Sequence, residues 1–385
     1  MRATRFEIID TTSGLHQLAS QLARFSRVAV DLEADSLYHY REKVCLVQIA
    51  AGPLHAVVDT IRVPNLDSLK PLFADNGVQK IFHGADYDVR SLYRDFGITI
   101  ANLFDTQLAS IYLGERETGL EAVLGKRYKI RLDKRFQKKD WTQRPLPKEM
   151  VEYAAMDVAH LVPLSDQLTA ELKATQRMAW VIEECQILSQ ARPASTNRGP
   201  LYLKFKGAGR LSPRHLAALE ALLRYRKATA RRKDKPLFKI FSNASLLKIA
   251  MNMPKDTAEL EVSGVLSAKQ LRMYRRGILG CIQKARQIPD ISLPHYPRSK
   301  APVIHARVPE RIRRIRVWRD AHARRLALEP PLLLNKALMG AIAVKNPNNM
   351  AELESVESLR KWQLDEFGPA ILGALTRRPH MVKEP

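Results

Sequence analysis

Arg27-Val-Ala-Val-Asp31-Leu-Glu33-Ala-Asp35 is the stretch that says most about the fold, because it is an apolar strand that ends in carboxylates. Strand side chains alternate between the two faces of a sheet, so Asp31 and Glu33 point to the same face. Carboxylates held that close resist ionising together unless a positive charge lies between them. A divalent cation with oxygen ligands would supply that charge, and a solvated loop after a strand is the simpler alternative.

The positive charge of the chain is concentrated in its C-terminal half. The chain has 385 residues and a formal net charge of +23. Residues 1–200 hold 26 Lys and Arg against 25 Asp and Glu, whereas residues 201–385 hold 37 against 15. This division suggests that one part grips a polyanion while the other part acts on it. Nucleic acid is the expected polyanion, because phosphate contacts by Lys and Arg dominate its binding.

Membrane and secreted proteins are disfavoured by the sequence. No long apolar helix, signal peptide or lipidation motif is visible, so no membrane partner is expected. The cysteines Cys45, Cys185 and Cys281 are too scattered to form a zinc cluster or a disulfide framework. We therefore expect a cytoplasmic protein, and a monomer.

The order of strand-like and helix-like segments predicts an α/β domain followed by two all-α domains. Strands are expected at 6–9, 28–31, 45–50, 55–58 and 80–83. Helices are expected at 15–24, 66–73, 86–96, 106–113 and 148–173. The expected domains cover residues 1–190, 205–288 and 303–378, with a proline-rich linker over residues 289–302 between the last two.

An internal repeat at a fixed offset of 93 residues predicts the two helical domains. Tyr225-Arg226 returns as Trp318-Arg319, and Ala230-Arg231-Arg232 returns as Ala323-Arg324-Arg325. The other matches in this register start from Pro254, Ala258-Glu259-Leu260, Gln270 and Ile278-Leu279-Gly280. Six matches in one register predict two copies of a small helical unit.

Two later segments hold acidic residues that could join Asp31 and Glu33. The segment from His83 to Asp88 follows a short predicted strand and begins a predicted helix. Asp86 and Asp88 therefore lie in the first turn of that helix. Acidic residues are favoured there by the helix dipole alone. Tyr153 and Asp157 lie four residues apart and share one helix face, although a core tyrosine beside a surface aspartate would give the same spacing.

Together these segments resemble the three motifs of the DEDD exonucleases, a superfamily named for four acidic residues. Val30-Asp31-Leu32-Glu33 resembles the first motif, His83-Gly84-Ala85-x-x-Asp88 the second and Tyr153-x-x-x-Asp157 the third. The tyrosine is typical of one subgroup. Within that subgroup the chain is similar over almost its whole length to the ribonuclease D family, through Phe104-Asp105-Thr106-Gln107, Leu132-Asp133-Lys134, Asp140-Trp141-x-x-Arg144-Pro145-Leu146 and two repeats that resemble HRDC domains.

The resemblance implies a ribonuclease H-like exonuclease domain, with a mixed sheet and flanking helices, before the two helical domains. It implies a metal-dependent 3′ to 5′ exoribonuclease that releases 5′-mononucleotides from single-stranded RNA ends, including those of tRNA precursors. Two Mg²⁺ or Mn²⁺ ions would be held by Asp31 as the bridging ligand, Glu33 and Asp157 on the nucleophile side, and Asp88 on the other side. Tyr153 would orient the attacking water, because a phenol is a poor base at neutral pH.

Four further residues are expected to contact the substrate: Arg135, Trp141, Arg231 and Arg232. Residues 126–139 hold eight basic residues against one acidic residue and could line the path of the strand, with Trp141 stacked on a base. A solvated loop with Trp141 in the core is equally compatible with the sequence. His83 is expected near the site without a catalytic role. A DNA-directed exonuclease of the same superfamily and an RNA-binding protein with a decayed site are the two alternatives.

Overall fold

The structure is a computed structural model that describes residues 6–132, 135–193, 199–297 and 305–376. It divides into two compact units. The first unit comprises residues 1–33, 44–193 and 302–385, and therefore holds the α/β domain and the second helical repeat. The second unit comprises residues 34–43 and 194–301, and therefore joins the first helical repeat to the segment that follows Glu33.

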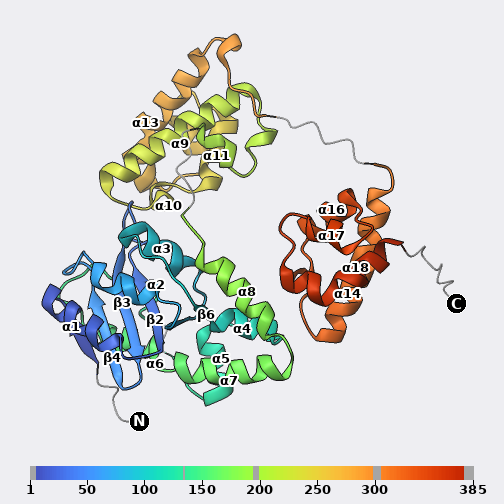
Figure 1. The fold of residues 1–385 in the computed structure, drawn as a ribbon. Helices are drawn as coiled ribbons and strands as arrows, with labels where there is room; N and C mark the ends of the chain where they lie inside the picture. The colour runs from blue at the N-terminus through green and yellow to red at the C-terminus, as the bar shows by residue number, and fades with distance from the viewer. Residues whose placement is uncertain (1–5, 133–134, 194–198, 298–304, 377–385) are drawn as a thin grey trace. The chain divides into compact units, whose positions relative to one another are not determined.

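A six-stranded mixed sheet forms the centre of the α/β domain (Figure 1). Its order is β1-β4-β3-β2-β5-β6. Strand β1 runs parallel to β4, and β5 runs parallel to both β2 and β6, whereas β3 and β4 are antiparallel. The strands are β1 (Glu7–Ile9), β2 (Arg27–Ala34), β3 (Val44–Ala51), β4 (Leu54–Asp59), β5 (Gln79–Phe82) and β6 (Leu103–Asp105).

The strand register brings two of the acidic segments to one edge of the sheet. Ala29 of β2 pairs with Ile81 of β5, and Phe82 of β5 pairs with Asp105 of β6. Because these three strands are parallel, the chain leaves them at the same edge. The end of β2 that carries Asp31 therefore lies beside the turn that follows β5, where α/β proteins commonly bind ligands.

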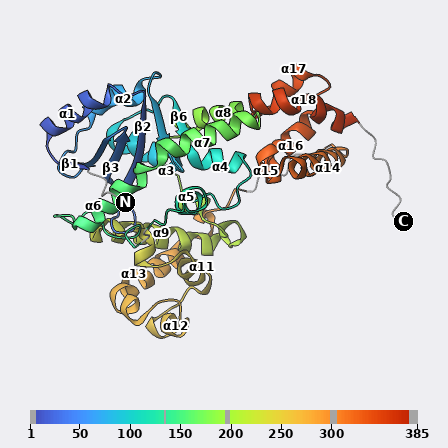
Figure 2. The same cartoon turned by 90° about the horizontal axis from the view of Figure 1, so that it is seen from below.

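Helices cover both faces of the sheet, with α6 on the side opposite α1 and α2 (Figure 2). Helix α6 packs on β3 and β4 through a small hydrophobic cluster that includes Trp141 and Met150. The helices of this domain are α1 (Thr12–Leu22), α2 (Lys70–Ala74), α3 (Asp86–Phe96), α4 (Thr106–Tyr112), α5 (Leu120–Tyr128), α6 (Lys148–Ala159), α7 (Leu161–Ala174) and α8 (Met178–Ser189), with a 3-10 turn at Asp67–Leu69.

The helix expected over residues 148–173 is two helices, which is a correction. Helix α6 ends at Ala159 and α7 begins at Leu161. Pro163 explains the break, because it has no N–H to donate to the carbonyl of Ala159 and its ring clashes with that carbonyl. Strand β6 and helices α5 and α8 were not expected from the sequence, since three residues show no period and α8 is apolar on most sides.

The two helical repeats have the same order of elements. The first contains α9 (Pro213–Lys233), α10 (Leu237–Ile240), α11 (Asn243–Asn252), α12 (Thr257–Val262) and α13 (Ala268–Gln287), with 3-10 turns at Leu201–Lys204, Ala208–Arg210 and Asp290–Ser292 around it. The second contains α14 (Val308–Leu326), α15 (Pro330–Leu333), α16 (Lys336–Lys345), α17 (Met350–Glu354) and α18 (Lys361–Thr376). Their caps keep the offset of 93: Ser242 and Asn335 are N-caps, and Met253 and Asn346 are left-handed C-caps. Residues 298–302 of the expected linker lie outside the described residues.

Within the first unit, the second repeat shares a hydrophobic core with the α/β domain. The rings of Trp180 on α8 and Trp362 on α18 stack with centroids 4.6 Å apart. Trp362 also donates its backbone N–H to Glu183 at 2.8 Å and its indole N–H to Glu184 at 3.1 Å. Arg177 donates to the carbonyl of Leu326 at 2.7 Å. Stacked aromatic rings with satisfied polar groups give a specific contact.

Candidate active site

Four carboxylates from three elements meet at the end of β2. Asp31 and Glu33 come from β2, Asp88 from the first turn of α3, and Asp157 from α6. Asp31, Glu33 and Asp157 line one cavity, and burial together with the charges of the other three carboxylates raises the pKa of Glu33 well above its ordinary value. The side chains of Asp88 and Asp157 are buried.

Burial is the main cause of a raised pKa throughout this cluster. It raises the pKa of Asp31 to about 7. Burial and the charge of Asp31 raise the pKa of Asp157 to about 8, and the same two causes, with Asp105, raise the pKa of Asp88 well above its ordinary value. Carboxylates in such a cluster are costly to ionise together without a compensating cation.

The donor chemistry of this cluster fits hard divalent cations, which take carboxylate oxygens. In the part of the chain that the structure describes, no three His, Cys, Asp or Glu side chains are arranged so that they could coordinate one metal ion. Binding would therefore require the carboxylates to turn toward the ion. The four carboxylates, of which Asp88 and Asp157 are buried and Asp31 and Glu33 partly buried, still supply the charge and the oxygen atoms that such an ion needs.

The two aspartates of the second motif have different surroundings. Asp88 is 7% exposed and interacts with the charge of Asp31. Asp86 is exposed and receives hydrogen bonds from the guanidinium of Arg90 at 2.8 to 3.1 Å, which lowers the pKa of Asp86. Asp86 therefore lies outside the carboxylate cluster and contributes to the surface of α3.

Asp105 fixes the turn that delivers Asp88 to the site. The carboxylate of Asp105 accepts hydrogen bonds from the backbone N–H groups of Gly84 at 2.9 Å and Ala85 at 2.8 Å. Gly84 has φ +77°, and a Cβ on it would lie 2.9 Å from Oε1 of Gln107. Only glycine adopts this conformation without strain. The sequence does not reveal this role of Asp105, because the bonds join residues about 20 positions apart.

His83 lies beside this turn and is held by a hydrogen-bond chain. Its Nδ1 lies 2.9 Å from the hydroxyl of Thr106, and that hydroxyl donates to the carbonyl of Phe82 at 2.9 Å. Burial lowers the pKa of His83. The imidazole is thus tied to the end of β5, as a structural element next to the carboxylates.

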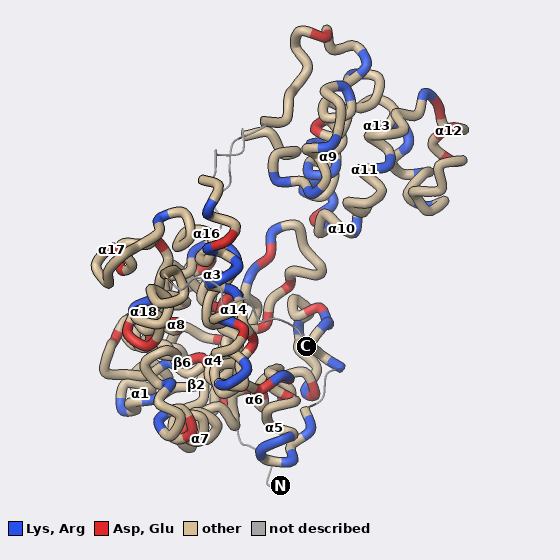
Figure 3. The backbone as a smooth tube through the Cα atoms, turned by 90° about the vertical axis from the view of Figure 1, so that its right-hand side faces the viewer, with Lys and Arg blue, Asp and Glu red and all other residues tan. Residues whose placement is uncertain are grey.

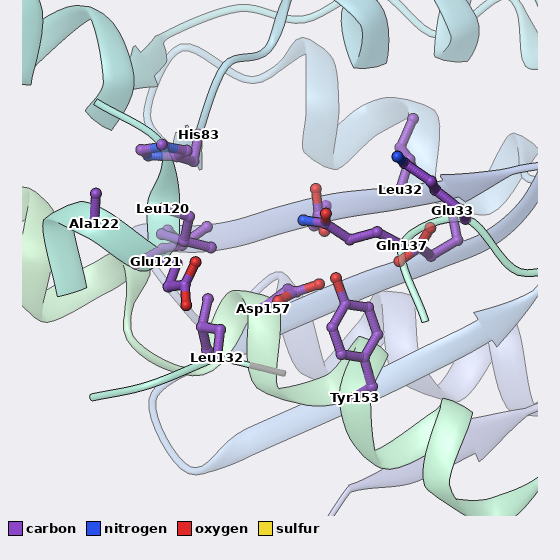
Figure 4. A pocket seen from close by; sticks show the side chains of 14 residues that line it. Leu32, Glu33, His83, Leu120, Glu121, Ala122, Leu132, Gln137, Tyr153 and Asp157 are labelled. Carbon is purple, nitrogen blue, oxygen red and sulfur yellow. The ribbon is translucent and has the colours of Figure 1, made fainter. Parts of the chain in front are cut away.

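Tyr153 reaches the site from α6, one turn before Asp157 (Figure 4). Its ring lies between those of Phe136 and Trp141, with centroids 5.8 and 6.2 Å away. The hydroxyl donates a hydrogen bond to Asp157. Burial and the nearby charges of Asp157 and Glu33 raise the pKa of Tyr153 far above its ordinary value, so the phenol stays protonated.

The expected substrate contacts differ in where the structure places them. Trp141 is 1% exposed and is stacked on Tyr153. The expectation that Trp141 stacks on a base is therefore corrected: its ring is used inside the core to support Tyr153. Arg135 is exposed over the ring of Phe136, and Arg231 and Arg232 are exposed on the last turn of α9.

A cavity of about 570 Å³ opens at the carboxylates. Four of the predicted residues, Asp31, Glu33, Tyr153 and Asp157, line it, and Figure 4 shows Glu33 and Tyr153 at one end with Gln137. The other end is formed by the start of α5. The full lining is Asp31, Leu32, Glu33, His83, Gly119, Leu120, Glu121, Ala122, Leu132, Gln137, Lys138, Tyr153, Asp157 and Leu161.

Known proteins resemble this chain in both its α/β domain and its two helical repeats. The family model described as 3′-5′ exonuclease matches residues 6–173, and the HRDC domain model matches residues 215–282 and 309–375. The ribonuclease D of Granulibacter bethesdensis is 30% identical over 369 residues, which cover 94% of this chain and 90% of the relative. The ribonuclease D of Escherichia coli is 27% identical over 75% of this chain and 77% of the relative.

Solved structures show the same relationship. The catalytic core of RRP6 from Trypanosoma brucei is 30% identical, with a TM-score of 0.64, and covers 73% of this chain and 80% of that chain. The crystal structure of Escherichia coli RNase D has a TM-score of 0.73 over 96% of this chain and 98% of that chain, at 23% identity, which shows the shared fold. The chain belongs to the ribonuclease D family, and it is a 3′-5′ exoribonuclease with two HRDC domains.

Proposed function

We propose that Asp31, Glu33, Asp88 and Asp157 hold two divalent ions, Mg²⁺ or Mn²⁺, and that the site releases 5′-mononucleotides from RNA 3′ ends. Enzymes of this family use divalent metal ions and act on RNA. The observation that carries the assignment is that Asp31, Glu33 and Asp157 line one cavity, and the charge of Asp88 acts on Glu33 together with theirs. A group of carboxylates held close together in this way is what a cation site requires.

Two ions at such a site supply an activated water and stabilise the departing oxygen of the phosphodiester. The protein contributes the geometry. Asp31 and Glu33 are fixed by strand β2, and Asp88 is fixed by the turn that Asp105 holds. Asp157 is held toward the cluster by its hydrogen bond from Tyr153.

Tyr153 is proposed to orient the attacking water. Its hydroxyl proton is engaged by Asp157, so its oxygen lone pairs are the groups that can accept a hydrogen bond from a water. Its pKa is raised further from neutrality, so removal of a proton by a phenolate is excluded as its role. The stacked ring of Trp141 and the ring of Phe136 keep the hydroxyl in place.

The proposed substrates are RNAs with single-stranded 3′ ends, including tRNA precursors. The Escherichia coli relative is described as an exoribonuclease involved in structured RNA processing. Residues 205–288, the proposed first HRDC domain, hold 19 Lys and Arg against five Asp and Glu, whereas residues 303–378, the proposed second, hold 14 against eight. Figure 3 shows the basic residues that recur along α9. The first repeat is therefore proposed as the main RNA-binding part, with Arg231 and Arg232 among its contacts, and Arg135 is proposed as a contact from the α/β domain.

The protein is also proposed to work in the cytoplasm as a monomer. Cys185 is a buried free thiol, which fits a reducing compartment. None of the helices in the described ranges is long and apolar enough to cross a membrane. Light scattering in solution would test the monomer.

The test of the assignment is digestion of matched RNA and DNA oligomers by the wild-type protein and by D157N in Mg²⁺ or Mn²⁺. The proposal expects mononucleotides from RNA, a loss of activity in D157N and no digestion after chelation. Digestion of DNA at the same rate as RNA would favour the DNA-directed alternative, because it would show that the site does not require a 2′-hydroxyl contact. Wild-type activity in D157N would contradict the assignment of the metal site.

A further inference from the structure

The segment that follows the carboxylates of β2 is built into the unit of the first helical repeat. We refer to residues 35–43 as the β2–β3 loop. Asp35 closes its base: the Asp35 N–H donates to the carbonyl of Lys43 at 3.2 Å, and the Lys43 N–H donates to Oδ1 of Asp35 at 2.7 Å. Asp35 is fully buried, so the base is fixed. Glu33 lies only two residues before this closure.

The tip of the β2–β3 loop is hydrogen-bonded to one carboxylate of the first repeat and makes two further contacts with that repeat. Oδ2 of Asp234 lies 2.7 Å from Nδ1 of His39, and Oδ1 of Asp234 accepts the Tyr40 N–H at 3.1 Å. The ammonium of Lys239 lies 4.3 Å from the ring centroid of Tyr38. The ring of Tyr40 packs against the hydrophobic core of the repeat. Three consecutive residues of the loop are thus engaged.

Asp234 occupies a position where its own helix does not favour it. It is the C-cap of α9 with φ +45°, a left-handed conformation that glycine and asparagine adopt more readily. An acidic side chain at a helix C-terminus is also opposed by the helix dipole. The hydrogen bonds from His39 and Tyr40 lower the pKa of Asp234 and offset these costs. The loop contact explains why a carboxylate stands here.

The second repeat provides a natural comparison. The residue 93 positions later is Ala327, which is the C-cap of α14 with φ +54°. The same corner of the second repeat therefore has the same backbone and no carboxylate. It contacts the α/β domain through main-chain groups, because Arg177 donates to the carbonyl of Leu326 and Gly114 leaves room for the carbonyl of Ala327. The carboxylate is specific to the repeat that holds the loop next to Glu33.

We propose that Asp234 is a positioning residue for the metal site, and that it acts by holding the β2–β3 loop and thereby the end of β2 that carries Glu33. The proposal rests on the proposed role of Glu33 as a metal ligand. Metal ligands must be held within about 0.5 Å of their productive positions by the groups around them. The connection from Asp234 to Glu33 is short. Asp234 is hydrogen-bonded to His39 and Tyr40 of the β2–β3 loop. That loop is closed at Asp35, which lies two residues after Glu33.

The test compares the full-length variants D234A and H39A with the wild type, in the absence of RNA. Hydrogen exchange of the metal-free protein should be about tenfold faster in residues 34–44 of both variants, because the loop loses its anchor. Calorimetric titration with Mn²⁺ should show about three- to tenfold weaker binding. This loss of affinity is smaller than the 10- to 100-fold loss that follows removal of a direct hydrogen-bond partner of a metal ligand. The D234A/H39A double variant should be no worse than D234A, because D234A already removes the bond to His39. D234N, which keeps an acceptor for the Tyr40 N–H, should bind Mn²⁺ nearly as the wild type does.

D256A is the matched control within the same repeat. Asp256 is the N-cap of α12, where its carboxylate accepts the Glu259 N–H at 2.9 Å, so its loss destabilises the repeat without touching the loop. D256A should bind Mn²⁺ as the wild type does. If E33Q weakens Mn²⁺ binding while D234A behaves like D256A in both measurements, the positioning role of Asp234 is wrong. If E33Q binds Mn²⁺ like the wild type, the assignment of the metal site itself fails.

Discussion

At the scale of single residues, the site combines groups that would be unfavourable apart from each other. Asp31, Glu33, Asp88 and Asp157 lie together in buried or partly buried positions, and burial raises the pKa of each. Such a cluster lowers the stability of the metal-free protein at neutral pH, as is common for functional sites. A bound cation would remove that cost, so stability and metal binding should depend on each other.

Y153F should lower the turnover rate about 100-fold, because the variant loses the hydroxyl that orients the water and holds Asp157. RNA binding should change less than twofold, since the ring and its contacts with Phe136 and Trp141 remain. Single-turnover kinetics together with a filter-binding titration separate the two quantities. Weaker RNA binding with an unchanged turnover rate would contradict the role given to the hydroxyl.

D157N should raise the unfolding free energy of the metal-free protein at pH 8 while abolishing activity. The pKa of Asp157 is about 8 in the folded protein and near 3.8 when unfolded, so the folded state binds the proton more tightly. The stabilisation is therefore fully present below about pH 4 and is lost as the pH rises toward 8. Denaturation in EDTA at pH 5 and pH 8 should show this loss in the wild type and a smaller one in D157N.

D86N is the control for that measurement, because Asp86 is exposed and the pKa of Asp86 is lowered by Arg90. Its substitution should not reduce the loss of stability between pH 5 and pH 8.

Added Mg²⁺ should stabilise the wild type more at pH 8 than at pH 5, since the ligands must be deprotonated. Equal stabilisation at both values would argue against carboxylate ligands.

At the scale of elements, strands β1 to β5 were predictable from their apolar runs, whereas β6 was not, and α3 was predicted with the bounds that the structure shows. The supports of the site were not predictable. Asp105 acts on Gly84 through bonds that join separate strands, and Trp141 is a buried support of Tyr153, although its sequence context suits an exposed stacking residue equally well. The periodicity of apolar residues indicates which side chains face a core, but it does not indicate which buried groups contact one another there.

G84A should destabilise the protein by about 1 to 3 kcal/mol, because alanine is strained at φ +77° and its Cβ would meet Gln107. Activity should fall as well, since the turn positions the start of α3 and Asp88. G280A is the control, because Gly280 lies inside α13 with no atom near its Cβ position. This change should stabilise the protein by about 0.5 to 1 kcal/mol. Thermal melts and Mg²⁺-dependent hydrolysis of both variants would check the pair, and wild-type behaviour of G84A would contradict the account of the turn.

At the scale of the whole molecule, two copies of one helical domain have taken different surroundings. The second copy joins the core of the α/β domain through Trp180 and Trp362, whereas the first copy carries more of the positive charge and holds the β2–β3 loop through Asp234. The repeat was visible in the sequence as an offset of 93 residues. The division of roles was not, because it depends on contacts with residues far away in the chain.

R231A/R232A should weaken binding of a structured RNA and reduce the slope of log affinity against log salt by about 2, because two phosphate contacts are removed. The equivalent pair in the second repeat is Arg324 and Arg325, and R324A/R325A should have a smaller effect. Salt titrations of binding for both double variants provide the comparison. Equal effects of the two pairs would show that the first repeat is not the main RNA-binding part.

The measurement that tests the central claim most directly is the product analysis of RNA labelled at its 3′ or its 5′ end, digested by the wild type and by D31N/D157N. The account predicts immediate loss of the 3′ label as a 5′-mononucleotide in Mg²⁺ or Mn²⁺, gradual shortening of the 5′-labelled strand, and no digestion by the variant. Internal fragments from the wild type, or wild-type activity in the variant, would contradict it.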